Sequence, residues 1–385
     1  MERRRFLKAM ATGTVVLGGG GFVAACRPDV PDDFGLGSPG FGPLAAADAN
    51  GLRLPAGFTS RVVATTGQVV PGTGYTWHTN PDGGACFTHP ATGGWIYVSN
   101  AESIGDGGAS MLRFDPSGTI VEARRILGGT LMNCAGGKTH TNTWLSCEEY
   151  DRAQVWECDP TGLTPAVARP AMGRFKHEAT ASDSWREVVY LTEDESDGAL
   201  YRFTPTAWPD LSAGLLEVLT ESAGTVAWAP VPNPTPTSAD TRTRYQVPNT
   251  KVFNGGEGAC VDKRGALYVT TKGDGRVWAL DPDEMRLVVV YDDGTSPTPH
   301  LTGVDNITVD GNGVLYVAED GGNMQIVAVG AAQQAVPVVE VTGVGGSEIT
   351  GPAFSPDGTR LYFSSQRHPG RTAEVTGPWA GGAPA

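Results

Sequence analysis

The sequence predicts an all-β protein, a six-bladed β-propeller, from two observations. A short strand of one aromatic and several small hydrophobic residues recurs six times, and carboxylates follow several copies. Successive aromatic residues are separated by 47, 46, 78, 48 and 46 positions, and they are Tyr97, Trp144, Tyr190, Tyr268, Tyr316 and Tyr362. A period in the forties is typical of propeller blades. The long third step predicts an insertion near 206–250.

The first 26 residues have the pattern of an export signal. Arg3, Arg4 and Arg5 begin a twin-arginine motif, and an apolar stretch leads to Cys26, which has the spacing of a lipobox. We expect export by the twin-arginine route and a lipid tether on Cys26, at the cell envelope in the periplasm or on the extracellular face. The alternative is an uncleaved anchor, for which this stretch is short.

The remaining chain divides into two parts. Residues 27–50 are rich in Pro, Gly, Ala and Asp, which predicts a flexible linker, and 51–385 form the propeller. Residues 52–65 are expected to supply the strand that closes the ring with the last blade. We expect a monomer.

The acidic composition limits the partners of this protein. The formal net charge is −14, which makes nucleic acid a poor partner. Lipidation of Cys26 leaves an odd number of cysteines, so at least one thiol stays unpaired. Cys147 and Cys158 lie on two strands of a predicted hairpin and could pair, whereas Cys134 is expected to remain free.

A second segment recurs ten to twelve residues before each aromatic residue. In a propeller the first strand of each blade lines the central channel, so these segments should form an inner ring. They are Gly84–Ala85–Cys86, Asn133–Cys134–Ala135, His177–Glu178–Ala179, Gly256–Glu257–Gly258, Val304–Asp305–Asn306 and Gly351–Pro352–Ala353.

Together with the carboxylates that follow the second strands, this ring predicts a metal site at one mouth of the channel. The side chains collected there are Cys134, Glu148, Glu149, Glu178, Glu193, Asp194, Glu195, Glu257, Asp305, Asn306, Glu319 and Asp320. Closely spaced carboxylates cannot all ionise unless cations neutralise them. Oxygen ligands favour calcium, and a thiolate favours a transition metal such as iron.

Simpler structural interpretations exist for several of these residues. Glu319 and Asp320 could form only a polar hairpin turn, and Cys134 could be a small buried hydrophobe. His177 is more often a structural hydrogen-bonding residue than a ligand. Glu102, Glu148 and the 193–197 run could face water. Glu178 and Glu257 are harder to explain in this way, because a lone carboxylate on a small-residue inner strand is costly unless it is paired.

These motifs resemble the PhoX-type alkaline phosphatases over nearly all of the chain that follows the signal. The segments that carry the resemblance are 133–137, 143–149, 177–178, 192–194, 271–274, 304–306, 318–323 and 347–352. Members of that family are twin-arginine-exported six-bladed propellers that hydrolyse phosphomonoesters with iron and calcium. A small phosphorylated substrate is therefore implied.

The resemblance also implies roles for individual residues. Fe(3+) would be held by Cys134, Glu149, Glu178 and Glu257. Ca(2+) would draw on Glu148, Glu193, Asp194, Asp305, Asn306, Glu319 or Asp320. Besides Glu257, the residues expected to act on the substrate are Lys272 and Arg276, as positive charges at the rim.

One departure from the family pattern bears on activity. The family carries a phosphate-contacting arginine two residues before the glutamate that aligns with Glu257, and this chain has Gly255. The expected function is an exported metal-dependent phosphomonoesterase. The alternatives are a metal-stabilised propeller that binds a partner or ligand without turnover, and a calcium-dependent lactonase or esterase.

The export signal gives a first testable prediction. Replacement of Arg3 and Arg4 by Lys should trap the precursor in the cytoplasm, and Cys26→Ala should release the exported protein from the membrane, because the lipid attachment site is lost. Cell fractionation measures both effects. Continued membrane association of Cys26→Ala would indicate an uncleaved anchor.

Overall fold

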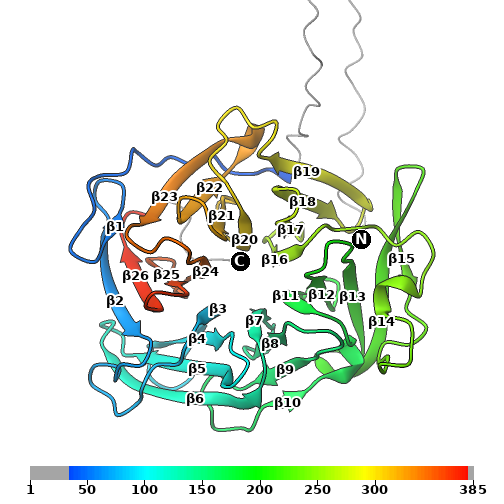
Figure 1. Cartoon of the computed structure of the whole chain (residues 1–385), viewed down its shortest axis with the longest axis horizontal. Helices are drawn as coiled ribbons and strands as arrows, with labels where there is room; N and C mark the ends of the chain where they lie inside the picture. The colour runs from blue at the N-terminus through cyan, green and yellow to red at the C-terminus, as the bar shows by residue number, and fades with distance from the viewer. Residues whose placement is uncertain (1–33, 380–385) are drawn as a thin grey trace, which may run out of the picture.

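The computed structural model describes residues 34–379, and the predicted six-bladed propeller is confirmed. Six antiparallel sheets surround a central channel, and each sheet lines the channel with one inner strand (Figure 1). Within the described residues, helical structure is limited to short 3-10 turns, and no helix is long and apolar enough to cross a membrane. The predicted signal peptide and Cys26 lie outside the described residues.

The blades follow one another in chain order. Blade 1 contains β3 (Pro81–Thr88), β4 (Trp95–Ala101), β5 (Gly107–Phe114) and β6 (Ile120–Thr130). Blade 2 contains β7 (Asn133–Lys138), β8 (Trp144–Glu148), β9 (Val155–Cys158) and β10 (Val167–Ala168). Blade 3 contains β11 (His177–Asp183), β12 (Val188–Glu193), β13 (Leu200–Ala207), β14 (Asp210–Ser222) and β15 (Thr225–Pro230).

The second half of the ring repeats this plan. Blade 4 contains β16 (Gly256–Val261), β17 (Leu267–Thr271), β18 (Arg276–Asp281) and β19 (Arg286–Asp292). Blade 5 contains β20 (Val304–Val309), β21 (Leu315–Glu319), β22 (Gln325–Val329) and β23 (Ala335–Val341), with β1 (Leu52–Arg53) at its edge. Blade 6 contains β24 (Ile349–Phe354), β25 (Arg360–Ser365), β26 (Arg371–Thr376) and the N-terminal β2 (Thr59–Thr65).

The ring closes as the sequence predicted. Strand β2 pairs antiparallel with β26, so the N-terminal part of the propeller supplies the outer strand of the last blade. The two residues of β1 pair with β23 of blade 5 instead. An N-terminal strand and the C-terminal strands therefore share one blade, which ties the two ends of the described chain together.

The hydrophobic core lies between adjacent blades. Each of the six clusters of buried side chains draws mainly on two neighbouring sheets, and the aromatic residues that defined the repeat are buried in them. Five of those residues are tyrosines that are fully buried, namely Tyr97, Tyr190, Tyr268, Tyr316 and Tyr362. The recurring aromatic residue is therefore a packing signal that fixes blade against blade.

The segment near 206–250 is only partly an insertion. Strand β13 continues to Ala207, and β14 is the blade's own fourth strand, with Leu216 and Val218 buried. The additions are β15 and the stretch that follows it, which returns to the blade through a bridge between Thr220 and Thr250. Many Pro and Thr residues make this hairpin look like a loop in the sequence.

The suggested pairing of Cys147 with Cys158 is wrong. The two residues lie on adjacent strands, but Cys147 faces Val155 and Cys158 faces Trp144, so neither thiol is opposite the other. Both are buried free thiols. A hairpin places two cysteines in range of each other only when they share one register position.

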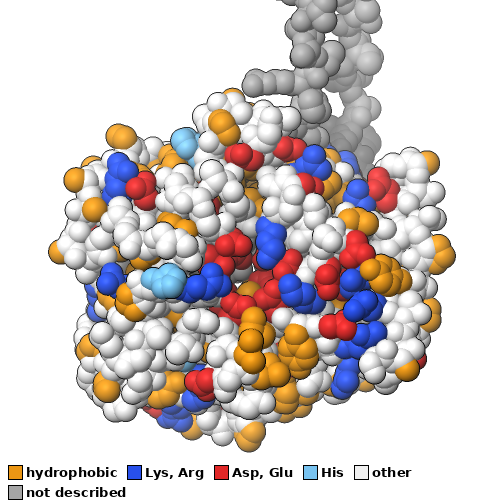
Figure 2. All heavy atoms as spheres, in the orientation of Figure 1, with side chains coloured by type: hydrophobic (Ala, Val, Ile, Leu, Met, Phe, Trp, Pro, Cys, Tyr) orange, Lys and Arg blue, Asp and Glu red, His pale blue; other side chains and the backbone are white. Residues whose placement is uncertain are grey.

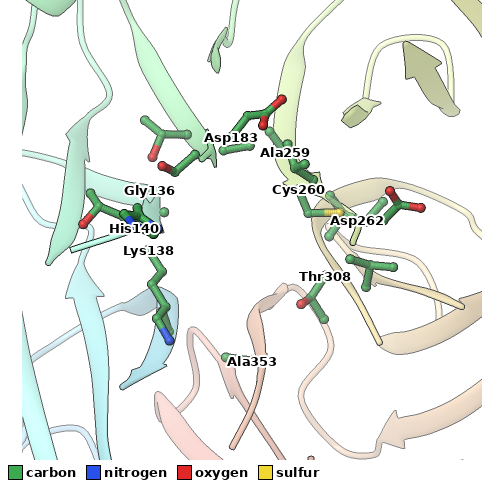
Figure 3. Close-up of a pocket in the computed structure, with 18 of the residues that line it drawn as sticks. Gly136, Lys138, His140, Asp183, Ala259, Cys260, Asp262, Thr308 and Ala353 are labelled. Carbon is green, nitrogen blue, oxygen red and sulfur yellow. The ribbon is translucent and has the colours of Figure 1, made fainter. Parts of the chain in front are cut away.

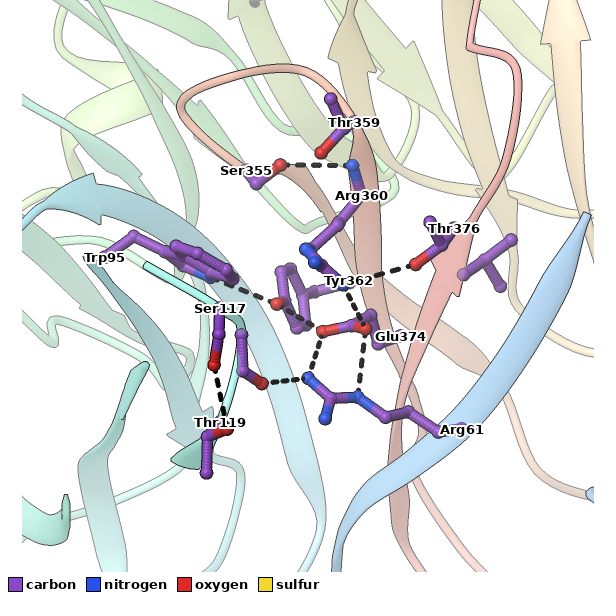
Figure 4. A network of polar contacts seen from close by, with 12 residues as sticks. Arg61, Trp95, Ser117, Thr119, Ser355, Thr359, Arg360, Tyr362, Glu374 and Thr376 are labelled. Carbon is purple, nitrogen blue, oxygen red and sulfur yellow. Dashed lines mark hydrogen bonds and ion pairs between the residues drawn. The ribbon is translucent and has the colours of Figure 1, made fainter. Parts of the chain in front are cut away.

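A polar network fastens the closing strand to the rest of the ring (Figure 4). Glu374 of β26 accepts two hydrogen bonds from Arg61 of β2, at 2.9 and 2.7 Å. The same carboxylate accepts a hydrogen bond from the Tyr362 hydroxyl at 2.5 Å and one from Arg360 at 2.9 Å. Trp95 of blade 1 in turn donates to Tyr362 at 3.0 Å. Glu374 is the buried centre of the network.

The network predicts a stability effect. Glu374→Ala should lower the free energy of unfolding by about 3 kcal/mol, because it leaves a buried hydroxyl and two guanidinium groups without their carboxylate. The urea midpoint measures this loss. The matched control is Glu340→Ala on the partly exposed Arg53–Glu340 pair, which should cost below about 1 kcal/mol. Equal losses in the two variants would contradict a special role of Glu374.

Candidate metal centre

All six inner hairpins share one irregularity at the same height of the channel. In each blade the register between the first and second strands shifts so that two residues of the inner strand oppose one residue of its neighbour. Such a β-bulge re-aims a side chain that regular alternation would place elsewhere. The bulged pairs are 82–83, 134–135, 178–179, 257–258, 305–306 and 351–352.

Five of the six bulges begin with a side chain that can bind a metal. These residues are Asp82, Cys134, Glu178, Glu257 and Asp305, and the sixth position is Gly351. The second residue of each bulge is small in most blades, which lets neighbouring inner strands approach. A Cβ atom on Gly83 would lie 2.5 Å from the Cα of Ala135, and one on Gly258 would lie 2.5 Å from the amide of Ile307.

The bulged side chains meet in three overlapping groups of candidate ligands. In each group, one ligand atom from every member lies within 4.8 Å of the others. The groups are Asp82 with Glu102 and Cys134, Cys134 with Glu149 and Glu178, and Glu178 with Glu257 and Asp305. Cys134 and Glu178 each belong to two groups, so the three form one continuous centre. Figure 2 shows it as a concentration of acidic side chains at the channel mouth.

Three second strands end in a pair of neighbouring carboxylates, and the two members of each pair point in different directions. Glu148, Glu193 and Glu319 end their strands and are buried within their blades. The Glu148 carboxylate accepts a hydrogen bond from the Leu131 amide at 3.1 Å. That of Glu319 accepts from the amides of Thr302 and Gln325, both at 2.8 Å. The structure therefore uses these carboxylates to hold loops and does not bring them to the centre.

Glu193 is occupied in the same way. It accepts a hydrogen bond from the Tyr201 hydroxyl at 2.8 Å and forms a buried ion pair with Arg244 at 2.8 Å. The next residues along each chain segment, Glu149 and Asp194, face the channel mouth instead, because successive side chains of an extended segment point to opposite sides. Of each predicted pair, the second member is the one near the metal centre.

Two lysines lie among the carboxylates. Lys176 contacts Glu149 at 2.9 Å and Asp194 at 2.7 Å. Lys272 contacts the same oxygen of Asp194 at 3.0 Å and Glu257 at 2.6 Å. Both ammonium groups are therefore at the centre, as expected for Lys272.

Arg276 is not at the centre. It pairs with Asp274 at 3.1 Å and with Asp292 at 2.8 Å along the side of blade 4. Its guanidinium also lies over the ring of Trp278, 5.7 Å from the centroid. The sequence placed Arg276 at the rim only because it is close to Lys272 in the chain, and the strand that begins at Arg276 carries it away.

The remaining predicted residues lie at the edge of the centre. Asn306 is buried, donates to Asp305 at 2.7 Å and accepts from the Gly351 amide at 2.6 Å, so it orients a candidate ligand. Asp320 is exposed beside Glu348. His177 is buried, donates a hydrogen bond from Nε2 to the Gly173 carbonyl at 3.2 Å, and has a structural role.

Sequence reasoning missed Asp82 and misjudged Glu102. The Gln366 side chain donates to both carboxylates, at 2.5 Å and 2.6 Å, and so ties blade 6 to blade 1 across the seam of the ring. The first hairpin is longer than the others, because β3 continues to Thr88 before the turn, so its bulge lies further from Tyr97 than the ten- to twelve-residue spacing allowed. The segment Gly84–Ala85–Cys86 consequently lies deeper in the channel.

The carboxyl groups of the centre resist ionisation. Burial, followed by repulsion from Glu257 and Glu149, raises the pKa of Glu178 well above its ordinary value. Burial raises the pKa of Glu257 to about 8 and that of Glu149 to about 7, although Lys272 and Lys176 oppose the shifts. Burial and the charge of Asp82 raise the pKa of the Cys134 thiol.

The donor set fits multivalent cations. Cys134 Sγ donates to one oxygen of Glu178 at 3.3 Å, and the other oxygen of this fully buried carboxylate has no hydrogen-bond partner. A buried carboxylate oxygen without a partner is costly unless a cation meets it. Thiol and carboxylate groups at this spacing are ligands for a transition metal, and the all-oxygen members suit a hard cation.

The other mouth of the channel has no comparable group of unpaired carboxylates among the described residues. A cavity of about 600 Å³ is lined there mainly by residues that follow the bulges along the inner strands and their turns, including Lys138, His140 and Cys260 (Figure 3). Its carboxylates already have partners, since Asp183 pairs with Arg186 and Asp262 pairs with Arg264. The candidate metal centre thus belongs to one mouth alone.

The raised pKa values predict how the metal-free protein responds to pH. A carboxyl group with a higher pKa in the folded state binds more protons there than in the unfolded chain, so folding stability falls as pH rises from about 4.5 to about 8. After chelation, the melting temperature should therefore be lower at pH 8 than at pH 5. Loading with metal should reverse this loss.

The variant Glu257→Gln provides the control for that experiment. It removes one of the titrating groups, so the chelated variant should lose less stability than the chelated wild type between pH 5 and pH 8. A chelated wild-type protein whose melting temperature rises over this interval would contradict the assigned pKa directions.

Comparison with known proteins agrees with the fold and the motifs. The family model for alkaline phosphatase PhoX matches residues 154–284. The structure of Pseudomonas fluorescens PhoX in complex with vanadate is similar with a TM-score of 0.72 at 18% identity, covering 88% of this chain and 97% of that one. No curated protein matches the chain.

Two further structures also match the chain. A protein of unknown function from Bacteroides thetaiotaomicron matches with a TM-score of 0.55 at 9% identity, covering 83% of this chain and 76% of that one. A gluconolactonase from Xanthomonas campestris matches with a TM-score of 0.49 at 14% identity, covering 89% of this chain and 100% of that one. The resemblance of this chain to the PhoX-type alkaline phosphatases is confirmed, in sequence over residues 154–284 and in fold over most of its length.

Proposed function

We propose that this protein is an exported, metal-dependent phosphomonoesterase of the PhoX type, with Fe(3+) and Ca(2+) in the channel mouth. The observation that carries the proposal is the convergence of a thiol and several carboxylates from five blades at one height of the channel. A structural ion would need one such group. Three overlapping groups with lysines beside them suit a centre that handles an anionic substrate.

The ligand groups suggest how the metals would be distributed. Cys134, Glu149 and Glu178 form the group with sulfur, which favours iron. Glu178 also belongs to the group with Glu257 and Asp305, so it would contribute to both groups. Asp82 and Glu102 would supply oxygen ligands suited to calcium. Bound metals of this kind would supply an activated nucleophile and charge stabilisation for phosphoryl transfer.

The lysines are the chain's own groups for holding phosphate. In the absence of cations they neutralise Glu149, Asp194 and Glu257. When cations take over that role, the ammonium groups are free to turn toward phosphate oxygens at the mouth. Both are partly exposed, at 28% and 37%, so a substrate can reach them.

The glycine at position 255, where the family has an arginine, leaves room for Lys272 to supply the positive charge beside Glu257. Its φ is +67°, a conformation that favours glycine, and a Cβ atom there would lie 2.9 Å from Lys272 Cγ. A side chain at 255 and the observed path of Lys272 therefore exclude each other. Lys272 approaches Glu257 from the neighbouring strand and would contribute the missing positive charge.

We also propose that the protein is a monomer, is exported by the twin-arginine route, and stays tethered through lipid on Cys26. Twin-arginine export carries folded proteins, which suits a metal centre built from several blades. The substrate would be a small phosphomonoester outside the cytoplasm.

Metal analysis tests the role of the thiol. Cys134→Ala should lower the bound iron by more than half and the bound calcium by less, because only iron gains substantially from a sulfur ligand. The matched control is Cys86→Ala, a buried thiol beyond the bulge of blade 1, which should leave both metals unchanged. Equal iron in the Cys134 variant and wild type would exclude sulfur ligation.

Kinetics test the role of Lys272. Lys272→Ala should reduce kcat/KM for p-nitrophenyl phosphate about 10- to 100-fold, the usual range for one lost charge-assisted contact. Arg276→Ala should stay within about twofold, because Arg276 pairs with Asp274 and Asp292 away from the centre. Metal-replete wild type without turnover would leave a ligand-binding propeller as the better account.

A further inference from the structure

We infer that the mouth beside the metal centre selects phosphomonoesters whose alcohol carries an apolar group, and that Ile104 and Leu131 contact this group. The inference rests on the proposed function. It starts from apolar side chains that the fold leaves in solvent at this mouth. Ile104 is 78% exposed, Leu131 43% and Tyr150 38%.

These three residues belong to one patch, although they come from three loops. The Met132 amide donates to the Ser103 carbonyl at 3.0 Å, which joins the loop of Ile104 to that of Leu131. The Leu131 amide and the Tyr150 hydroxyl both donate to Glu148, at 3.1 and 3.4 Å. Apolar side chains that stay exposed together with a polar rim are a feature of ligand-binding sites.

The patch adjoins the candidate ligands in every loop. Ile104 follows Glu102 by two residues, Leu131 precedes Cys134 by three, and Tyr150 directly follows Glu149. The Glu149 amide also donates to the Met132 carbonyl at 2.8 Å, so the ligand and the patch share one backbone contact. Figure 2 shows apolar side chains directly beside the acidic centre.

The position of the patch determines what it contacts. A phosphate held by the metals and by Lys176 and Lys272 must project its ester group out of the mouth, because the inner strands approach each other closely at the bulges. On the side of blades 1 and 2 that group meets the patch. On the side of blades 3 and 4 it meets the charged residues around Asp194. An apolar alcohol gains from the first surface, whereas a polyol gains nothing there.

The test compares two esters whose leaving alcohols have similar reactivity. Wild-type, metal-loaded protein should hydrolyse hexyl phosphate with a kcat/KM about tenfold above that for glycerol 3-phosphate, the gain expected from burying one or two methylene groups. Ile104→Ser and Leu131→Ser should each reduce this preference, and the double variant should abolish it. Activity on glycerol 3-phosphate should not change.

The matched control is Leu163→Ser. Leu163 is also 78% exposed, but it follows β9 at the end of blade 2 that is remote from Glu148, so its loss should not alter the preference. Equal kcat/KM for both esters in wild type, or a preference that survives in the double variant, would overturn the inference while leaving the phosphatase proposal intact.

A binding measurement keeps the inference testable if no ester is hydrolysed. Calorimetry should show hexylphosphonate binding to metal-loaded protein about tenfold more tightly than methylphosphonate, and the difference should vanish in the Ile104→Ser, Leu131→Ser double variant. Such binding without turnover would support the patch and defeat the phosphatase proposal. Equal affinities would overturn the patch.

Discussion

The structure depends on the β-bulge that every blade carries at the same height of the channel. The bulge turns one inner residue toward the axis, and hydrogen bonds between blades hold its backbone there. The Asn100 side chain donates to the carbonyls of Cys134 and Ala135 at 3.1 and 2.7 Å. The Thr192 and Thr270 hydroxyls donate to the carbonyls of Glu257 and Asp305, at 2.5 and 2.6 Å. The residue opposite one bulge thus positions the ligand of the next blade.

This arrangement concentrates negative charge that the protein alone cannot neutralise. Lys176 and Lys272 balance part of it, and protonation balances more in the absence of metal, as the raised pKa values of Glu178 and Asp305 indicate. Bound cations can replace both the lysines and the protons as the balancing charge. The two mouths of the channel consequently differ in how their charges are balanced, because the carboxylates at the opposite mouth are already paired with arginines.

The sixth blade breaks the pattern in a way that shapes the site. Gly351 occupies its bulge with a φ of +58°, and a Cβ atom there would lie 2.8 Å from the Gly84 amide and 2.9 Å from the Asp82 carbonyl. Blade 6 therefore offers no ligand at that height. It contributes Gln366 instead, which orients Asp82 and Glu102 from the rim. The boundary between blades 6 and 1, where the ring closes, therefore also positions two residues of the site.

The sequence by itself determined the number of blades, the closing strand and the inner positions of Cys134, Glu178, Glu257 and Asp305, because aromatic spacing and strand alternation are local properties. Tertiary structure decided which member of each carboxylate pair faces the channel, since a single residue of register separates Glu148 from Glu149. It also decided that Asp82 joins the centre and Arg276 leaves it. The length of a hairpin and the direction of a strand set those positions, and neither changes the residue pattern from which the blades were predicted.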